Sequence, residues 1–292
     1  MNFQKVTLQN VIELKKILTQ YSNELTCEIN VANLLIWQPL YNNCFCLDNN
    51  ILFLKSHSDT QEIYSLPFGD MKTGFKKISE QASTPYPDIW AQAGPRFDEF
   101  NSLYGEHYDI LESRNEFDYI YNSTDLINLS GKKYHSKRNH ISAFSKQFDW
   151  NYEDITVKNI SAVRECADIW YGQNAQRIDE ELKNEKLGCY KLLENMDLLD
   201  IKGGAITVDN KIVAFTLGSP INKNIYNIHI EKAIAGFETA YTVINREFAA
   251  RNCAKYRYIN REDDLGLEGL RRAKLSYKPE IILPKYICTR KV

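Results

Sequence analysis

The 292-residue sequence lacks the marks of several protein classes. Its seven cysteines are scattered and form no C-x-x-C pair, which argues against a disulfide framework or a zinc site and favours reduced thiols. No run is long and apolar enough to span a bilayer. The N-terminal segment has no apolar signal-peptide core. We therefore expect a cytoplasmic protein, which would act on lipid only from the membrane surface.

Strong charge of one sign is absent too. The formal net charge is -2, which argues against a generally cationic nucleic-acid binder but leaves room for a local basic patch. No P-loop, G-x-G-x-x-G or G-x-S-x-G motif occurs. What is present is a globular composition, 43% hydrophobic and 25% charged, in a chain long enough for one large domain or two ordinary ones.

Periodicity in the second half predicts two helices, then strand, strand, strand, helix, strand, helix and strand. Asp209-Asn210 lies between the first two strands and suits a tight hairpin turn. Four apolar side chains from Phe237 to Phe248 recur at helical spacing and predict one buried helix face. The predicted ranges are 160–174, 175–200, 204–208, 211–218, 224–231, a helix around 237–248, 256–260, 265–274 and 280–288.

The first half repeats this order loosely, which predicts duplication of one architecture. Its ranges are strands 44–47, 51–55 and 62–68, helix 71–82, a short strand within 84–95, helix 97–111 and strand 118–121. A long polar-basic helix is expected over 124–148. We therefore predict an α/β (α+β) protein of two tandem halves, residues 1–149 with the basic helix and residues 150–292, each a mixed sheet flanked by helices. No low-complexity linker separates them, so they should pack tightly.

Three segments resemble a known family. They are residues 121–148, beginning YNSTDLINLSGKKYHSKRNHISAF, residues 229–249, HIEKAIAGFETAYTVINREFA, and residues 258–279, YINREDDLGLEGLRRAKLSYKP. The sequence resembles the bacterial family related to the C-terminal domain of phosphatidylglycerol lysyltransferase. This resemblance implies a tandem GNAT-like (acyl-CoA N-acyltransferase-like) fold, akin to Fem-type peptidyltransferases. It also implies transfer of an aminoacyl group from aminoacyl-tRNA to a lipid or peptide acceptor.

The sequence departs from the acetyltransferase pattern at one turn. Acetyl-CoA enzymes carry Arg/Gln-x-x-Gly-x-Gly/Ala there, so that backbone N–H groups cradle pyrophosphate. Residues 231–237 read EKAIAGF, with Gly236 as the single glycine. No cofactor is therefore assigned, and the donor is expected to be either aminoacyl-tRNA or acyl-CoA. The acceptor is expected to be an amine or hydroxyl on a small molecule or a lipid headgroup.

Cations on apolar helix faces are candidates for binding an anion. Lys137 and Arg138 fall within or beside the apolar stripe of the basic helix, and a buried cation must pair or bind an anion. Arg138 suits bidentate contact best. The alternative is that these side chains extend to solvent or pair with acids. The full candidate set, in which two helices converge on one ligand, is Lys133, Lys137, Arg138, Arg261, Arg271 and Lys274.

Proton transfer requires a base near the acceptor. His229 and Glu231 alternate with isoleucines, so they are expected to share one strand face, and either could be the base. Glu262 follows a strand at a rim position, and Tyr277 could protonate a leaving group. The alternatives are a structural histidine, ordinary salt bridges, and an N-cap role for Asp263 or Asp264. No metal site is predicted.

Three functions remain open from the sequence. The leading one is an aminoacyl- or acyltransferase in which the cations and an acid converge. The second is a non-catalytic GNAT-like protein that binds an anionic small molecule, which the single-glycine turn favours. The third is RNA binding through the basic helix. The sequence leaves open whether the chain is an enzyme.

Overall fold

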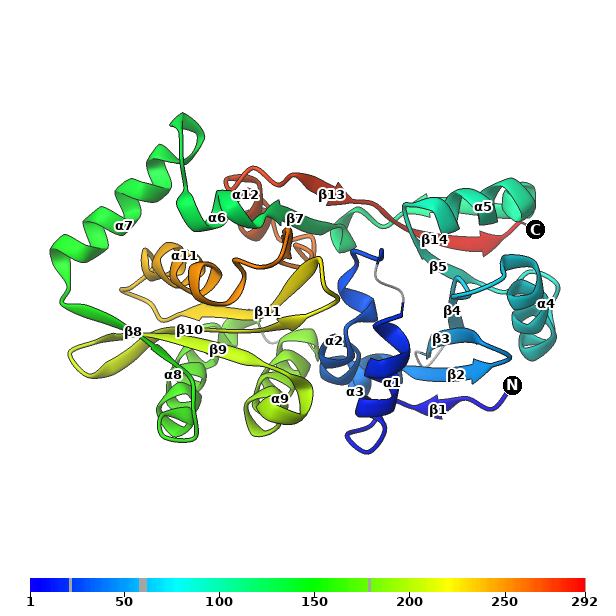
Figure 1. Cartoon of the computed structure of the whole chain (residues 1–292), viewed down its shortest axis with the longest axis horizontal. Coiled ribbons are helices and arrows are strands. Elements are labelled where there is room, and N and C mark those ends of the chain that lie inside the picture. Colours follow the sequence, from blue (N-terminus) through cyan, green and yellow to red (C-terminus); the bar gives the residue numbers. More distant parts are fainter. Residues whose placement is uncertain (21–22, 58–61, 178–179, 292) are drawn as a thin grey trace.

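The computed structural model describes residues 1–20, 23–57, 62–177 and 180–291. Two seven-stranded mixed sheets lie side by side, each with helices packed on it (Figure 1). The first sheet has the order β1 (Gln4–Lys5), β2 (Cys44–Asp48), β3 (Ile51–His57), β4 (Glu62–Ser65), β5 (Ile89–Gln92), β14 (Lys285–Arg290), β6 (Tyr108–Glu112). Its part of the chain also forms α1 (Val11–Leu18), α2 (Val31–Ile36), α3 (Gln38–Tyr41), α4 (Met71–Ala82) and α5 (Pro95–Tyr104).

The second sheet carries helices on both faces. Its order is β13 (Ile281–Leu283), β7 (Asp118–Asn122), β12 (Tyr258–Asn260), β11 (Ile225–Ala233), β10 (Lys211–Pro220), β9 (Lys202–Val208), β8 (Trp150–Asp154). One face bears α6 (Ser123–Asn128), α7 (His135–Gln147) and α11 (Ala240–Asn252), and the other bears α8 (Ile160–Gln173) and α9 (Glu180–Glu194) (Figure 1). The remaining helices are α10 (Met196–Leu199) and α12 (Glu268–Leu275).

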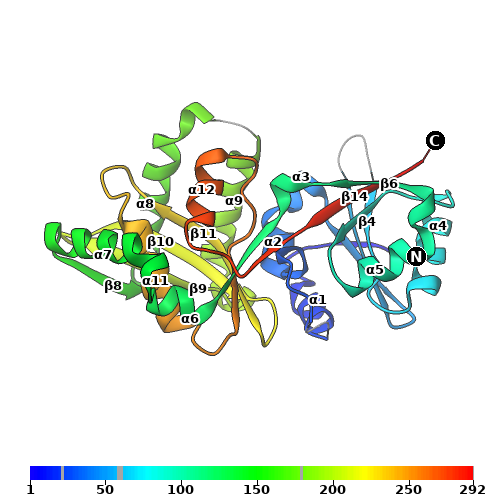
Figure 2. The same cartoon turned by 90° about the horizontal axis from the view of Figure 1, so that it is seen from above.

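The two sheets exchange strands along the chain. β7 pairs with β12 and β13 of the second sheet, although its residues belong to the predicted first half, 1–149. The predicted single strand 280–288 is divided at Pro284: β13 belongs to the second sheet, and β14 pairs with β5 and β6 of the first. Figure 2 shows the C-terminal chain running from one body to the other. The division into residues 1–149 and 150–292 stays a prediction, because the sheets themselves are not separated there.

Most predicted elements are present, and two predicted helices, in addition to the divided strand, differ in an instructive way. α4 spans the predicted range 71–82, and the β9–β10 turn has positive φ at Asp209 (50°) and Asn210 (60°), as a tight hairpin requires. The predicted helix over 124–148 is broken, because Leu129 (φ 48°) and Gly131 (φ 81°) adopt left-handed conformations that end α6 before α7 begins. The predicted helix 97–111 ends at Tyr104, where the chain turns into β6. In the range 175–200, residues 178 and 179 lie outside the described residues.

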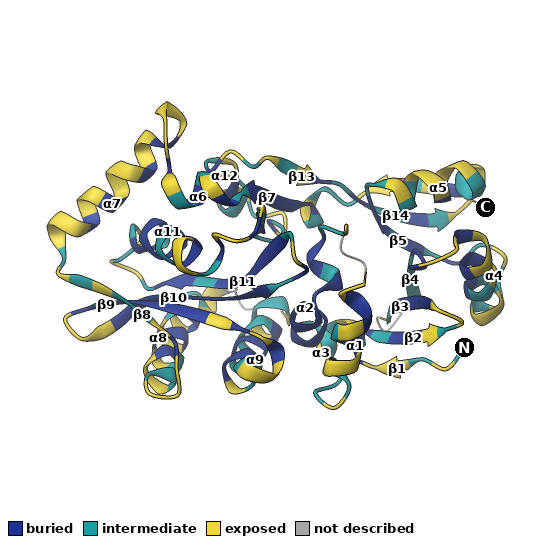
Figure 3. Ribbon diagram, in the orientation of Figure 1, coloured by how far each residue is buried: buried dark blue, intermediate teal, exposed yellow. Residues whose placement is uncertain are grey.

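One apolar core continues from the N-terminal helices into the second sheet. Leu14 of α1 and Leu35 of α2 belong to the same buried cluster as Val163, Leu192 and Phe215. Figure 3 shows α2 and the strands β9, β10 and β11 largely buried, whereas α7 is exposed along most of its surface. The tight packing expected from the absence of a linker is therefore observed. Among the described residues, no helix combines the length and apolar character needed to cross a membrane.

A bulge between β10 and β11 sets the direction of the polar side chains that follow. Leu217 pairs with Ile230 and Gly218 with Ile228, so His229 is an extra residue in the ladder. His229 then lies beside Ser219, with Nε2 2.9 Å from Oγ, whereas Glu231 contacts Asn245 on α11. The expectation that His229 and Glu231 share a strand face is wrong, because the bulge interrupts the alternation.

Replacing Gly218 with alanine should lower the free energy of unfolding by about 1–3 kcal/mol, the usual cost of overpacking. A Cβ atom there would lie 2.5 Å from the backbone oxygen of Asn227, which cannot move without disturbing the bulge. Gly172→Ala is the matched control, because nothing lies within 4 Å of its Cβ position, and alanine in a helix should be neutral or stabilising. Urea unfolding measures both. Equal stability of the two variants would contradict the steric argument.

Candidate functional site

The site lies where β11 and β12 separate. These parallel strands pair over three residues, from Ile225 with Tyr258 to Asn227 with Asn260. β11 then continues to Ala233, whereas the chain leaves β12 after Asn260. Side chains from the segment after β12 bridge the gap to β11. Glu262, in that segment, has a left-handed backbone conformation (φ 57°). Arg261 reaches Glu231, and Glu262 reaches His229. Two polar clusters result.

The Glu262 cluster consists of Glu262, His229, Ser219, Asn227 and Asn33. Oε1 of Glu262 accepts from Nδ2 of Asn227 (2.6 Å) and Nδ2 of Asn33 (3.3 Å) and lies 3.1 Å from Nδ1 of His229. Nδ1 of His229 also lies 2.9 Å from Nδ2 of Asn227, and Nε2 faces the Ser219 hydroxyl. Each ring nitrogen donates or accepts according to the tautomer. Within the described residues, Oε2 of Glu262 meets no hydrogen-bond donor. The side chain is 18% exposed, so the carboxylate is only partly shielded from solvent.

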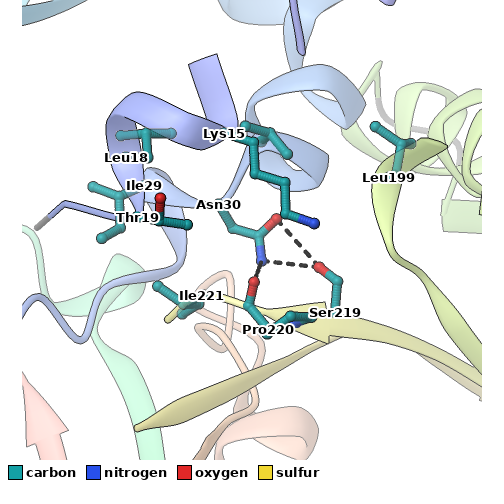
Figure 4. Close-up of a pocket in the computed structure, with 10 residues that line it drawn as sticks. Lys15, Leu18, Thr19, Ile29, Asn30, Leu199, Ser219, Pro220 and Ile221 are labelled. Carbon is teal, nitrogen blue, oxygen red and sulfur yellow. Dashed lines mark hydrogen bonds between the residues drawn. The ribbon is translucent and has the colours of Figure 1, made fainter. Parts of the chain in front are cut away.

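A small cavity lies beside this cluster. It is lined by residues of α1, of the start of α2 and of the end of β10, among them Asn30 and Ser219 (Figure 4). Nδ2 of Asn30 donates to Oγ of Ser219 (3.0 Å) and to the carbonyl oxygen of Pro220 (3.3 Å). The cavity has a volume of about 10 Å³, which holds at most one water molecule. It therefore supports the position of Ser219 rather than admitting a substrate.

The Arg261 cluster lies on the α11 face of the sheet and consists of Arg261, Glu231, Tyr277, Lys137 and Asn245. Nη2 of Arg261 donates to Oε1 of Glu231 (2.6 Å), and Nδ2 of Asn245 donates to Oε2 (3.0 Å). The centroid of the Tyr277 ring lies 4.8 Å from the Arg261 guanidinium and 3.8 Å from Nζ of Lys137. Burial and the charge of Arg261 lower the pKa of Lys137 to about 8. Both oxygens of Glu231 already have partners, which makes it a poorer base than Glu262.

A third cluster, at the junction of the two sheets, was missed by sequence reasoning. Nζ of Lys285 lies 2.8 Å from Oδ1 of Asp118 and also donates to Glu28. Asp118 accepts from the backbone N–H of Cys27 (2.9 Å) and from Nδ2 of Asn260 (2.8 Å). Burial alone would raise the pKa of Asp118, but Lys285 and these hydrogen bonds hold it below its usual value. Cys27, Glu28 and Asp118 have metal-ligand spacing, yet the Lys285 ammonium already supplies the positive charge between them.

Asp263 and Lys274 lie between these clusters. Burial, together with nearby Asp118 and Glu262, raises the pKa of Asp263 to about 7. Nζ of Lys274 donates to the carbonyl oxygens of Arg261 (2.6 Å) and Asp263, so it supports the loop. The N-cap role expected for Asp263 or Asp264 is wrong, because the residue before α12 is Leu267.

Asp264 instead holds the loop before α12. Its buried carboxylate accepts from Arg271 (2.8 and 2.9 Å), from the Tyr119 hydroxyl (2.6 Å) and from the backbone N–H of Gly266 (2.9 Å). Burial opposes ionisation, but these hydrogen bonds lower the pKa of Asp264 to about 2. Arg271 therefore has a structural partner.

The structure brings some of the sequence candidates together and separates others. Glu231, Arg261, Tyr277 and Lys137 form one cluster, His229 and Glu262 the neighbouring one, and Lys274 lies under the loop that joins them. Lys133 pairs with Asp125 (2.7 Å). Arg138 is exposed and donates to the carbonyl oxygens of Leu129 and Gly131 at the end of α6. Lys133, Arg138 and Arg271 thus lie apart from the clusters.

The residues that sequence reasoning missed are mostly amides and long-range ion pairs. Ser219, Asn227 and Asn33 hydrogen-bond to His229 or Glu262, residues that the fold brings close although they lie apart in the sequence. Lys285 and Asp118 carried a usable signal, because each is a charged residue at the start of an otherwise apolar strand. A charge in that position needs a buried partner.

Comparisons with known proteins identify the family of this chain. The family model described as phosphatidylglycerol lysyltransferase, C-terminal, matches residues 20–289. A conserved protein of unknown function from Bacteroides thetaiotaomicron is 35% identical, with a TM-score of 0.93 over 100% of both chains. The C-terminal domain of a putative lysylphosphatidylglycerol synthetase from Agrobacterium fabrum is 13% identical, with a TM-score of 0.68 over 98% of this chain and 92% of that one.

One curated relative also matches. An uncharacterised protein of Mycoplasmoides gallisepticum is 22% identical over 62% of this chain. The match spans 58% of the length of that relative.

More distant structures define the fold. FemX has a TM-score of 0.57 at 9% identity, and a tandem GNAT protein from the clavulanic acid biosynthesis pathway has 0.50 at 6% identity. Each likeness covers at least 97% of both chains. The fold is therefore tandem GNAT-like, as predicted from the resemblance. Because the family model covers nearly the whole sequence, this chain belongs to the family of the phosphatidylglycerol lysyltransferase C-terminal domain.

Proposed function

We propose that this protein is an acyl- or aminoacyltransferase in which Glu262 accepts the proton of the attacking amine or hydroxyl. The observation that carries the proposal is the asymmetry of the Glu262 carboxylate. One oxygen is held by Asn227, Asn33 and His229, and the other meets no hydrogen-bond donor among the described residues. A fixed carboxylate with one free oxygen suits general base catalysis.

The proton transfers balance with these residues. Oε2 of Glu262 takes the proton as the acceptor nitrogen or oxygen attacks the donor carbonyl, the bond to the leaving group breaks, and that group leaves protonated. His229 lies 3.1 Å from Oε1 and so helps to position the carboxylate that takes the proton. Tyr277 stays the proposed proton donor to the leaving group, and after product release Glu262 returns its proton to solvent while the phenolate takes one from solvent. Burial raises the pKa of this phenol and so keeps it protonated at neutral pH.

Aminoacyl-tRNA is the favoured donor over acyl-CoA. In the turn between β11 and α11, the backbone N–H of Gly236 donates to Oε1 of Glu238 (3.0 Å), and that of Ala235 donates to Oε1 of Gln173 (2.8 Å). Two donors that would cradle a pyrophosphate are thus engaged, and Glu238 would repel it. The name of the family and the exposed basic face of α7 also favour tRNA. A lipid headgroup or a small amine is the proposed acceptor.

The test is a transfer assay with two donors. We expect the protein to move the labelled group from aminoacyl-tRNA to an added amine or phosphatidylglycerol acceptor, at a rate at least about 10-fold above the uncatalysed reaction. Acetyl-CoA run in parallel should show no such acceleration. Transfer from acetyl-CoA alone would reverse the choice of donor. No transfer from either would contradict catalysis and favour the non-catalytic alternative.

A further inference from the structure

We propose that Asn30 and Ser219 are positioning residues for Glu262, because they hold His229 in the tautomer whose proton lies on Nδ1. A chain of hydrogen bonds connects these four side chains, from the start of α2 to the loop after β12. The role of the chain in transfer rests on the proposed function of Glu262. The tautomer of His229 can be measured without turnover, so the two proposals can fail separately.

The direction of the chain is set at Asn30, which is the N-cap residue of α2. Oδ1 of Asn30 accepts from the backbone N–H of Ala32 (2.8 Å), a group that has no partner within the helix. Nδ2 therefore faces the other way, where it donates to the carbonyl oxygen of Pro220 (3.3 Å) and to Oγ of Ser219 (3.0 Å) (Figure 4). The reversed amide would place its NH2 group against the N–H of Ala32 and its oxygen against a carbonyl oxygen, so this orientation is fixed.

Ser219 passes this direction on to His229. Its hydroxyl has one proton to donate, and Oγ already accepts from Nδ2 of Asn30. Among the described residues, the acceptors within reach are Nε2 of His229 at 2.9 Å and Oδ1 of Asn30 at 3.3 Å. The second distance exceeds the usual range for a hydroxyl donor, and Oδ1 already accepts from Ala32. The Ser219 proton is therefore assigned to Nε2, which must itself carry no proton.

The proton of the imidazole then lies on Nδ1, where it meets Glu262. A neutral imidazole with a bare Nε2 is protonated on Nδ1, and Oε1 of Glu262 accepts at 3.1 Å. In the other tautomer a lone pair would face the carboxylate oxygen, and two acceptors repel each other. Nδ2 of Asn227 lies 2.9 Å from Nδ1 and donates to the same Oε1, so both N–H groups converge on one oxygen. This holds Oε1 and leaves Oε2 for a substrate.

Burial keeps water from competing for these groups. Asn30 is 3% exposed and Ser219 1%, and the His229 side chain is fully buried. Inside a protein each unmet donor or acceptor costs more than at the surface, so a complete chain favours one arrangement strongly. α2 therefore contributes to the Glu262 site in two ways, through this chain and through the direct contact of Asn33 with Oε1.

The experiment is nuclear magnetic resonance of the full chain, isotope-labelled at the histidine nitrogens, whose chemical shifts distinguish the two tautomers. His229 is one of five histidines, and its signal is the one that His229→Gln removes. In wild type at neutral pH we expect the proton on Nδ1. Ser219→Ala removes the donor to Nε2, so the ratio of the Nδ1–H to the Nε2–H tautomer should fall about 3- to 10-fold, the equivalent of one neutral hydrogen bond.

Ser123→Ala is the matched control. Ser123 is as buried as Ser219, at 1% exposed, but its Oγ has no hydrogen-bond partner among the described residues. The control should leave the tautomer ratio and the transfer rate within about twofold of wild type. Ser219→Ala should lower kcat about 3- to 10-fold with little change in KM, because it disturbs the position of the base and not the binding of substrate.

Two results of the resonance experiment would overturn the chain: the Nε2–H tautomer in wild type, or equal tautomer ratios in wild type and Ser219→Ala. An unchanged kcat in Ser219→Ala, despite an altered tautomer ratio, would overturn its role in transfer. Absence of any transfer by wild type with the expected tautomers would contradict the proposed function of Glu262 and would still support the chain.

Discussion

Replacing Lys285 with methionine should lower the free energy of unfolding by about 3–5 kcal/mol, the range for breaking a buried ion pair from one side. Lys285 and Asp118 are both fully buried and lie 2.8 Å apart. Methionine fills a similar volume, so packing changes little. The substitution leaves Asp118 ionised, without its cation, in a site that excludes water. Burial would then raise the pKa of Asp118, whose present low value depends on Lys285.

Urea unfolding at pH 7 measures this effect. Lys291→Met is the matched control, because Lys291 is exposed and its ammonium group donates to the carbonyl oxygen of Glu106; it should change the free energy by less than about 0.5 kcal/mol. Adding Asp118→Asn to Lys285→Met should recover part of the loss, because the uncompensated charge is then removed. If Lys285→Met and the control had equal stability, the buried pair would not be holding the junction.

This pair matters because of where the chain crosses. Lys285 is the first residue of β14, directly after Pro284, and Asp118 is the first residue of β7. Each of these strands joins the other sheet from the strand that precedes it in sequence. Asp118 also accepts from Asn260, which immediately precedes Arg261 and Glu262. The cluster thus fixes the crossing and the loop that carries the candidate base together.

The sequence predicts what is local and misses what depends on distant partners. The α4 helix and the Asp209-Asn210 turn follow from periodicity and turn chemistry, and Lys137 was found because it falls in an apolar stripe. The bulge at His229 was missed, because it arises from how β10 and β11 pair, with an extra residue on β11. The sequence of β11 alone does not indicate it. Lys285 was missed for the same reason. Its partner Glu28 lies 257 residues away in the chain, although Pro284 and a charge in an apolar strand indicated that residues 280–288 are not one simple strand.

Replacing Glu262 with glutamine should lower the rate of group transfer at least about 100-fold, the lower end of what a general base contributes. Glutamine is nearly isosteric, and its oxygen can still accept from Asn227 and Asn33, so the fold should be retained. What is lost is the ability of the second oxygen to take a proton. We expect kcat to fall while KM changes little, because the proton moves only in the transition state.

The control for Glu262→Gln is Glu268→Gln, which removes an exposed acid paired with Arg272 and should leave transfer within about twofold of wild type. Unfolding midpoints of both variants separate lost chemistry from lost structure. The pH profile is the sharper readout: the limb that reports the base should disappear in Glu262→Gln. If transfer instead continues at nearly the wild-type rate, Asp263 becomes the better base, because its pKa of about 7 is poised for proton transfer and its carboxyl lies beside Glu262 in the same loop. Asp263→Asn would then have to remove the limb that Glu262→Gln left in place.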